Sequence, residues 1–154
     1  MMSPRQLIEH MADKSLNCRT AILWIAPGRI GTESQIAASL GVQHVDYREY
    51  LLQHAPADSQ FLNLTLGRIV SQLDDIASAS TGMDRALVSN FDLAAARLGS
   101  QQRASLWRTL FSDFSHRTKA LIFSLPLHED GQYIFSDLAV GRMWKDSERC
   151  SIWP

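Results

Sequence analysis

Short runs of apolar residues with the length of β-strands recur along the chain. We predict strands at residues 21–26, 42–47, 86–90 and 120–125, with a candidate fifth strand at residues 131–135. The first run is apolar on both faces, as is typical of a central strand in a parallel sheet. The third run differs because it ends in two polar residues, Ser89 and Asn90.

Between these runs, apolar residues recur at the spacing of amphipathic helices. We predict helices at residues 3–16, 33–40, 48–54, 66–78, 93–98 and 101–116. Ser3 and Ser100 are candidate N-caps, since their hydroxyl groups can accept a hydrogen bond from the first turn. Gly41 suits the left-handed conformation that often follows the end of a helix.

Helices and strands therefore alternate, and this order requires crossover connections between parallel strands. The sequence predicts a three-layer α/β fold: a mostly parallel sheet of four or five strands flanked by helices, similar to P-loop NTPases. The length of 154 residues favours a single domain over residues 1–154. The path of residues 137–154 stays open, because Trp144 and Trp153 can pack on the core or form an interface.

The composition is ordinary for a soluble globular protein, with 45% hydrophobic and 20% charged residues and a formal net charge of -1. No run approaches the ~18–20 apolar residues of a membrane span. The first residues also lack the apolar core of a signal peptide. Cys18 and Cys150 are isolated, as expected for reduced thiols. We therefore expect a cytoplasmic protein.

The carboxyl ends of the predicted strands carry the candidate chemistry, because ligands of parallel sheets gather there. A Walker A loop reads G-x-x-x-x-G-K-[ST]; its lysine holds phosphates and its hydroxyl binds magnesium. In the stretch APGRIGTE, residues 26–33, Gly31 matches, but Thr32 replaces the lysine and Glu33 the hydroxyl. The lost attraction is roughly 4 kcal/mol at ~4 Å and an effective dielectric of about 20. The candidate nucleotide- or anion-binding residues are Gly28, Arg29, Ile30, Gly31, Thr32 and Glu33.

The stretch LVSNFD, residues 87–92, is similar to a Walker B strand, which normally ends in an acid that holds magnesium. Ser89 takes the position of that acid and supplies no charge. Asp92 follows later, and it can either serve magnesium or cap the helix predicted from residue 93. The Walker B-like residues are thus Ser89, Asn90 and Asp92. A fourth polar group, Ser124, lies near the end of the strand at residues 120–125.

The chain resembles the small P-loop proteins of bacterial BREX phage-defence systems, the BrxF-like group. The resemblance spans most of the chain and rests on the element order, the glycine loop, LVSNFDLAAARL at residues 87–98 and HRTKALIFSLP at residues 116–126. It implies a P-loop fold and a place among the protein subunits of an anti-phage defence complex. Loops of that family carry the lysine and the hydroxyl that Thr32 and Glu33 replace here, which counts against nucleotide hydrolysis.

The remaining histidines, serines and cations of the sequence define no further site with a recognisable motif. The five histidines are scattered without metal-ligand spacing, so we expect no metal site. Ser89 and Ser124 lack a histidine partner that the sequence alone can identify. A basic stretch can meet DNA or an acidic protein face, or form a solvated helix face. Its cations are Arg97, Arg103, Arg108, Arg117 and Lys119.

The sequence thus favours a non-catalytic, degenerate P-loop-like accessory or adaptor protein, with no catalytic residue, no required cofactor and other protein subunits as partners. One alternative is a nucleotide-dependent switch or weak ATPase that uses ATP and magnesium. In that case Arg29 would replace the lysine charge and Asp92 would serve magnesium. The other alternative is a small DNA-binding module that uses the basic stretch. The sequence leaves the oligomeric state open.

Overall fold

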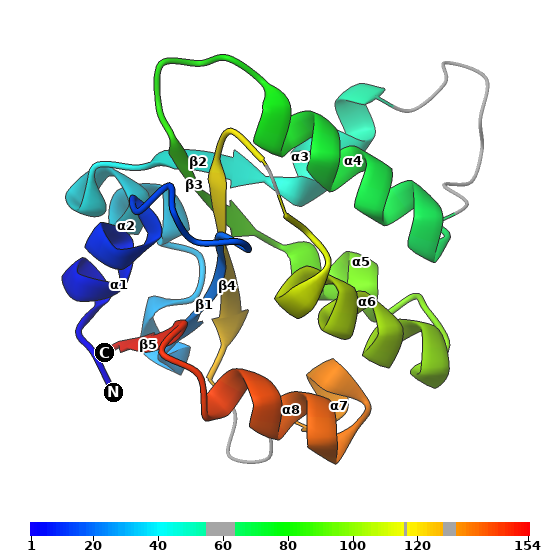
Figure 1. Ribbon diagram of the computed structural model, residues 1–154. Helices are drawn as coiled ribbons and strands as arrows, with labels where there is room; N and C mark the ends of the chain where they lie inside the picture. The colour runs from blue at the N-terminus through cyan, green and yellow to red at the C-terminus, as the bar shows by residue number, and fades with distance from the viewer. Residues whose placement is uncertain (55–63, 116, 128–131) are drawn as a thin grey trace.

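The computed structural model describes residues 1–54, 64–115, 117–127 and 132–154. At its centre lies a five-stranded sheet with the order β2-β3-β4-β1-β5, in which every strand pair is parallel (Figure 1). The strands are β1 (Thr20–Ile25), β2 (Gln43–Asp46), β3 (Arg85–Ser89), β4 (Ala120–Pro126) and β5 (Cys150–Trp153). The crossover topology expected from the sequence is therefore confirmed.

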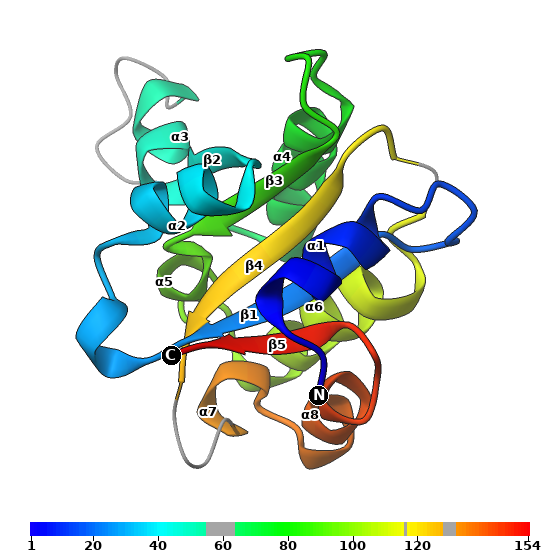
Figure 2. The same cartoon turned by 90° about the vertical axis from the view of Figure 1, so that its left-hand side faces the viewer.

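Helices cover both faces of the sheet, which confirms the three-layer α/β fold (Figures 1 and 2). They are α1 (Pro4–Met11), the 3-10 helix η1 (Pro27–Arg29), α2 (Glu33–Leu40), α3 (Tyr47–His54), α4 (Leu66–Ser78), α5 (Phe91–Ala95), α6 (Ser100–Ser112), α7 (Gln132–Phe135) and α8 (Leu138–Lys145). Helices α1 and α2 pack on one face, and the residues of α3 to α8 pack on the other. In the described part of the chain, no helix combines the length and the apolar character needed to cross a bilayer.

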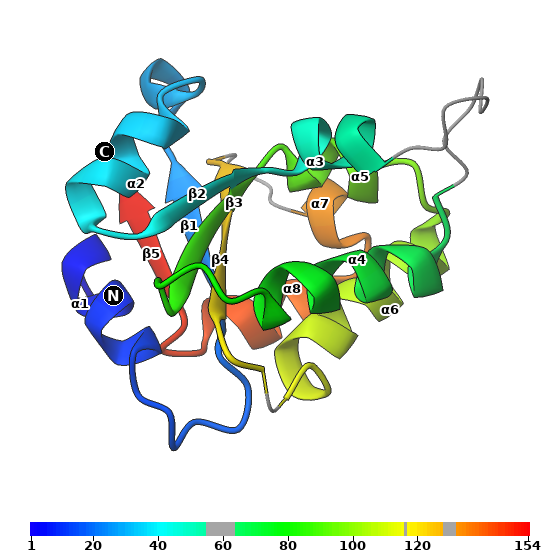
Figure 3. The same cartoon turned by 90° about the horizontal axis from the view of Figure 1, so that it is seen from above.

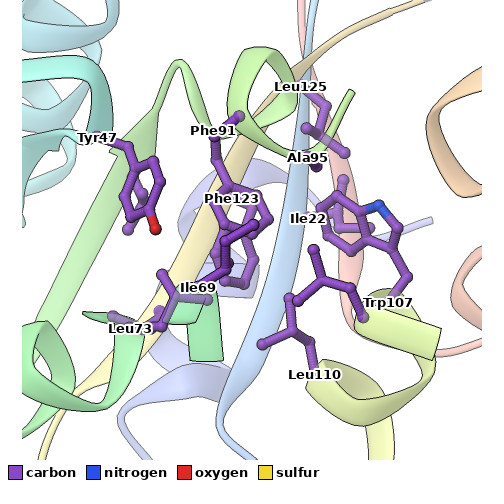
Figure 4. Packing of buried hydrophobic residues seen from close by; sticks show 14 of the residues in the cluster. Ile22, Tyr47, Ile69, Leu73, Phe91, Ala95, Trp107, Leu110, Phe123 and Leu125 are labelled. Carbon is purple, nitrogen blue, oxygen red and sulfur yellow. The ribbon is translucent and has the colours of Figure 1, made fainter. Parts of the chain in front are cut away.

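The larger core cluster is built around Trp107 of α6 (Figure 4). Four aromatic rings meet the indole edge-to-face at centroid distances of 5.3 to 6.0 Å: Phe91, Phe123, Phe135 and Trp144. Trp144 is fully buried, and its Nε1 donates a hydrogen bond to the Trp107 carbonyl at 3.2 Å. The segment from α8 to β5 therefore packs on the protein's own core and completes the sheet, which settles the path that the sequence left open.

The fifth strand predicted at residues 131–135 is wrong. Residue 131 lies outside the described residues, and Gln132–Phe135 form α7. A strand with one buried face would bury every second residue, whereas the consecutive Ile134 and Phe135 are both buried. The Ile134 carbonyl also accepts a hydrogen bond from Trp107 Nε1 at 3.1 Å. The fifth strand is instead β5, which pairs with β1 at the edge of the sheet.

The ends of three helices depart from the prediction. Helix α1 begins after the expected N-cap, Ser3, but it ends at Met11, whose carbonyl accepts a hydrogen bond from Arg19 Nε at 3.0 Å. Ser100 is the first residue of α6 rather than its N-cap, which is Gly99. Helix α6 ends at Ser112, short of residue 116, which lies outside the described residues. Helix α5 begins at Phe91, two residues before the predicted start at residue 93.

Candidate functional site

The carboxyl ends of β1, β3 and β4 meet at one edge of the sheet (Figure 2). Strand β4 lies between β1 and β3, and all three strands run in the same direction. The edge brings together the loop at residues 27–32, the turn formed by Ser89 and Asn90, and Ser124. We call this group, with the first turns of α2 and α5, the carboxyl edge. It contains the nucleotide-binding and Walker B-like candidates named from the sequence.

The loop at residues 27–32 closes on itself through backbone hydrogen bonds. The Arg29 amide donates to the Ala26 carbonyl at 2.8 Å, and the Thr32 amide donates to the Arg29 carbonyl at 3.1 Å. Thr32 Oγ1 also donates to the Arg29 carbonyl, at 2.6 Å. Gly31 permits the turn into α2 because its φ of 94° lies in the region that favours glycine. Two of the loop amides are therefore already engaged within the loop, and so is the hydroxyl of the residue that replaces the lysine.

The outer surface of the loop is exposed and partly apolar. Arg29 and Gly28 are exposed, and Ile30 leaves 54% of its surface accessible to solvent. A second exposed apolar side chain, Leu93 at 57%, lies in the first turns of α5. Both belong to segments that leave the carboxyl edge. The edge thus offers apolar side chains to a ligand as well as charge.

Two carboxylates lie at the carboxyl edge, on the first turns of α2 and α5. Burial is the main cause that raises the pKa of Asp92, and the negative charge of Glu33 raises it further. The backbone N–H groups of Asp92 and Leu93 oppose this rise by donating to the carboxylate. Asp92 does not cap a helix that starts at residue 93, because α5 begins at Phe91 and its N-cap is Asn90.

The turn after β3 is tied to the neighbouring strand β2 by two side-chain hydrogen bonds. Ser89 is 3% exposed, and its Oγ lies 2.8 Å from His44 Nε2. Asn90 adopts a left-handed conformation with a φ of 60°, and its Nδ2 donates to Asp46 Oδ1 at 2.9 Å. The same carboxylate accepts the Arg48 amide at 3.0 Å in the first turn of α3. The two Walker B-like positions Ser89 and Asn90 are thus committed to bonds within the protein.

The sequence reasoning missed His44 and Asp46 as members of this edge. Their signal was present: within the predicted strand at residues 42–47, His44 and Asp46 are two apart and therefore face the same side. What the sequence could not supply was the pairing of β2 with β3, which places Asp46 opposite Ser89.

The Ser89–His44 pair has the spacing of a nucleophile and its general base. Two observations favour a structural role instead. The serine is almost completely buried, so a substrate cannot reach its hydroxyl. Among the described residues, no carboxylate lies within hydrogen-bond distance of His44 to orient the ring, and no group of three or more His, Cys, Asp or Glu side chains could hold a metal ion.

The five cations of the basic stretch do not share one exposed face. Arg97 and Arg108 are exposed. Arg103 donates to Ser136 Oγ and to the Leu98 carbonyl, both at 3.0 Å. Arg117 Nε pairs with Asp74 at 2.5 Å, and the guanidinium lies 4.6 Å from the centroid of the Phe114 ring. Lys119 is 1% exposed, and its Nζ donates to Gln43 Oε1 at 2.8 Å. Three of the five cations therefore hold the protein's own segments together.

The raised pKa of Asp92 predicts that its charge destabilises the fold at neutral pH. The folded protein binds the Asp92 proton more tightly than the unfolded chain, so ionisation above the ordinary Asp pKa favours unfolding. Asp92→Asn keeps an acceptor for the two amides. It should raise the midpoint of thermal unfolding at pH 7; the gain should shrink as pH falls through the raised pKa of Asp92 and should be lost below the ordinary Asp pKa of about 4.

Asp75→Asn, at an exposed position on α4, is the control and should show no comparable gain. The cause of the shift can be checked separately with Glu33→Gln. This variant should lower the pKa of Asp92, measured by NMR titration of the Asp92 carboxyl carbon. A pKa of Asp92 that does not respond to Glu33→Gln would contradict the proximity of the two acids.

A structural Ser89–His44 bond predicts a loss of stability when the serine hydroxyl is removed. Ser89→Ala leaves a partly buried imidazole without its partner and should lower the free energy of unfolding by about 1–2 kcal/mol in urea titrations. Ser34→Ala, at an exposed position, should stay within about 0.5 kcal/mol. A fluorophosphonate probe should leave the native protein unmodified, and labelling that depends on both Ser89 and His44 would show a catalytic pair instead.

Comparison of the sequence with protein-family models found no family that matches, and comparison with curated proteins found no match either. What the residues of the carboxyl edge can do is therefore judged from their geometry and charge.

Proposed function

We propose that this protein is a non-catalytic, P-loop-like adaptor that acts in the cytoplasm within a larger assembly, such as an anti-phage defence complex. The observation that carries the proposal is the charge of the carboxyl edge. Thr32 replaces the lysine of a nucleotide-binding loop, and the acidic pair formed by Glu33 and Asp92 lies at the first turns of the two helices.

The electrostatics of this edge disfavour a bound triphosphate. The missing lysine removes an attraction of roughly 4 kcal/mol at ~4 Å and an effective dielectric of about 20. Glu33 adds repulsion at the place where a magnesium-binding hydroxyl is needed. Arg29 is exposed to solvent, and exposed ion pairs are typically worth no more than about 1 kcal/mol, so its guanidinium compensates only in part.

The exposed apolar side chains favour a protein as the partner of this edge. Ile30 and Leu93 are both more than half exposed, and they belong to the two segments that carry Glu33 and Asp92. Protein interfaces combine such apolar positions with a polar rim. The closed loop supports the same interpretation, because Thr32 has its hydroxyl engaged with the Arg29 carbonyl.

A nucleotide-dependent switch or weak ATPase is the second candidate function. It is favoured by the exposed guanidinium of Arg29 next to Gly31 and by the carboxylate of Asp92, which could hold magnesium. DNA binding is supported less well, because Arg97 and Arg108 are the exposed members of the basic stretch. We therefore rank the adaptor first.

Arg29→Glu distinguishes the adaptor from the switch. In an adaptor the exposed side chain carries no phosphate, so the variant should keep its free energy of unfolding within about 0.5 kcal/mol of the wild type. Millimolar Mg-ATP should leave the unfolding midpoint of both proteins unchanged, whereas a ligand at 100 times its Kd would stabilise the fold by about 2.7 kcal/mol. Arg5→Glu, at an exposed position on α1, is the matched control. Stabilisation of the wild type by Mg-ATP that Arg29→Glu removes would establish the switch.

A further inference from the structure

A groove of about 560 Å³ lies beside β2, between α3 and α4. All four residues of β2 line it, and each of them is only partly buried. One wall comes from α3, where the rings of Tyr50 and His54 stack at a centroid distance of 4.0 Å. The opposite wall comes from the end of α4, including Asp75 and Ile76.

Among the described residues, strand β2 keeps one side of its backbone unpaired. It is the first strand in the sheet order, and of the strands that the structure describes only β3 pairs with it (Figure 3). A parallel strand points its backbone groups alternately to its two sides, so an edge strand keeps a row of unpaired N–H and C=O groups. Within the described residues, no other segment forms a backbone hydrogen bond with Gln43–Asp46.

The opposite edge of the sheet, formed by β5, has the N-terminal segment beside it. Strand β5 lies beside the N-terminal segment, where Ser151 Oγ donates to the Met2 carbonyl at 2.8 Å and α1 packs against the strand. The N-terminal segment thus lies next to the β5 edge. The β2 edge instead borders the groove of about 560 Å³.

The charged residues around the groove indicate which kind of peptide segment it would bind. Glu49 on α3 and Asp75 on α4 are exposed, and they lie on opposite walls. The charge of Asp75 acts across the groove, since it adds to the effect of burial in raising the pKa of Tyr50. A third carboxylate, Asp46, stands at the end of β2. Such a rim attracts cationic side chains and repels nucleic acid.

The lining of the groove also holds a buried cation. Lys119 is 1% exposed, and its Nζ donates a hydrogen bond to Gln43 Oε1 at 2.8 Å. Lys119 thus fixes the side chain of the first residue of β2 from inside the protein. The groove combines an unpaired strand edge with an acidic rim.

We propose that the β2 groove binds an extended, basic segment of a partner protein, which adds a sixth strand to the sheet and places Lys or Arg side chains against Glu49 and Asp75. Main-chain hydrogen bonds give such an added strand its affinity, and the side-chain sites give it specificity. The inference rests on the proposed adaptor role and names the chemistry of one partner segment.

The test uses the full chain and a synthetic peptide of about ten residues in which Lys or Arg alternates with Val or Thr. Fluorescence anisotropy at low salt should show binding, which should weaken as salt is raised. Glu49→Lys combined with Asp75→Lys should weaken binding by about tenfold or more, equivalent to about 1.4 kcal/mol. Glu9→Lys, at an exposed acid on α1, should change the affinity by less than about twofold.

Strand addition is distinguished from simple charge attraction by two further measurements. Amide hydrogen exchange in Gln43–Asp46 should slow when the peptide binds, because free edge groups become hydrogen-bonded. A peptide of the same charge with proline at alternate positions should fail to bind, since proline lacks the amide hydrogen. Absence of binding, binding that is indifferent to the double variant, or binding that leaves β2 exchange unchanged would each overturn the proposal.

The peptide-binding test of the groove and the ATP-binding test of the adaptor role can fail independently of each other. If the protein binds neither the peptide nor ATP, the groove proposal fails and the adaptor proposal stands. If the protein binds ATP through Arg29, the adaptor proposal fails, and the peptide result still decides whether β2 accepts a strand. Circular dichroism of the double variant shows whether a loss of binding reflects unfolding; Glu49 and Asp75 are exposed, so the fold should persist.

Discussion

Two carboxylates, Glu33 and Asp92, lie in the first turns of helices at the carboxyl edge, where the positive field of a helix end favours negative charge. In a nucleotide-binding protein this field is available to phosphate. Here Glu33 lies in the first turn of α2, and Asp92 receives backbone N–H groups at the start of α5. The edge keeps the layout of a P-loop fold, but its charge suits an internal role or a protein partner better than a triphosphate.

Two side-chain hydrogen bonds fix the turn after β3 at the carboxyl edge. Ser89 is fixed to His44, and Asn90 is fixed to Asp46, so the turn after β3 is held by β2 on one side. In the part of the chain that the structure describes, strand β2 leaves its other side unpaired beside the groove. In the proposed adaptor role, the fixed edge would meet one subunit and the unpaired strand another.

Local patterns predicted most of the fold. Four strands, the helix Leu66–Ser78 and the end of α2 at Gly41 follow from hydrophobic spacing and from the preference of glycine for a φ of 72°. Strand β5 was missed because four residues carry too little periodicity, and its place depends on the open side of β1. For the candidate site, the sequence exposed the altered Walker positions. It could not show that Ser89 meets His44 or that Glu33 influences Asp92, because those pairs depend on the order of the strands.

Calorimetric titration of the wild-type protein with ATP and with ADP, each with and without magnesium, tests the central claim most directly. No heat of binding is expected at millimolar nucleotide, because Thr32 stands where phosphate needs a lysine and Glu33 stands where magnesium needs a hydroxyl. Micromolar binding in the presence of magnesium would contradict this expectation and would show that the loop at residues 27–32 still holds phosphate.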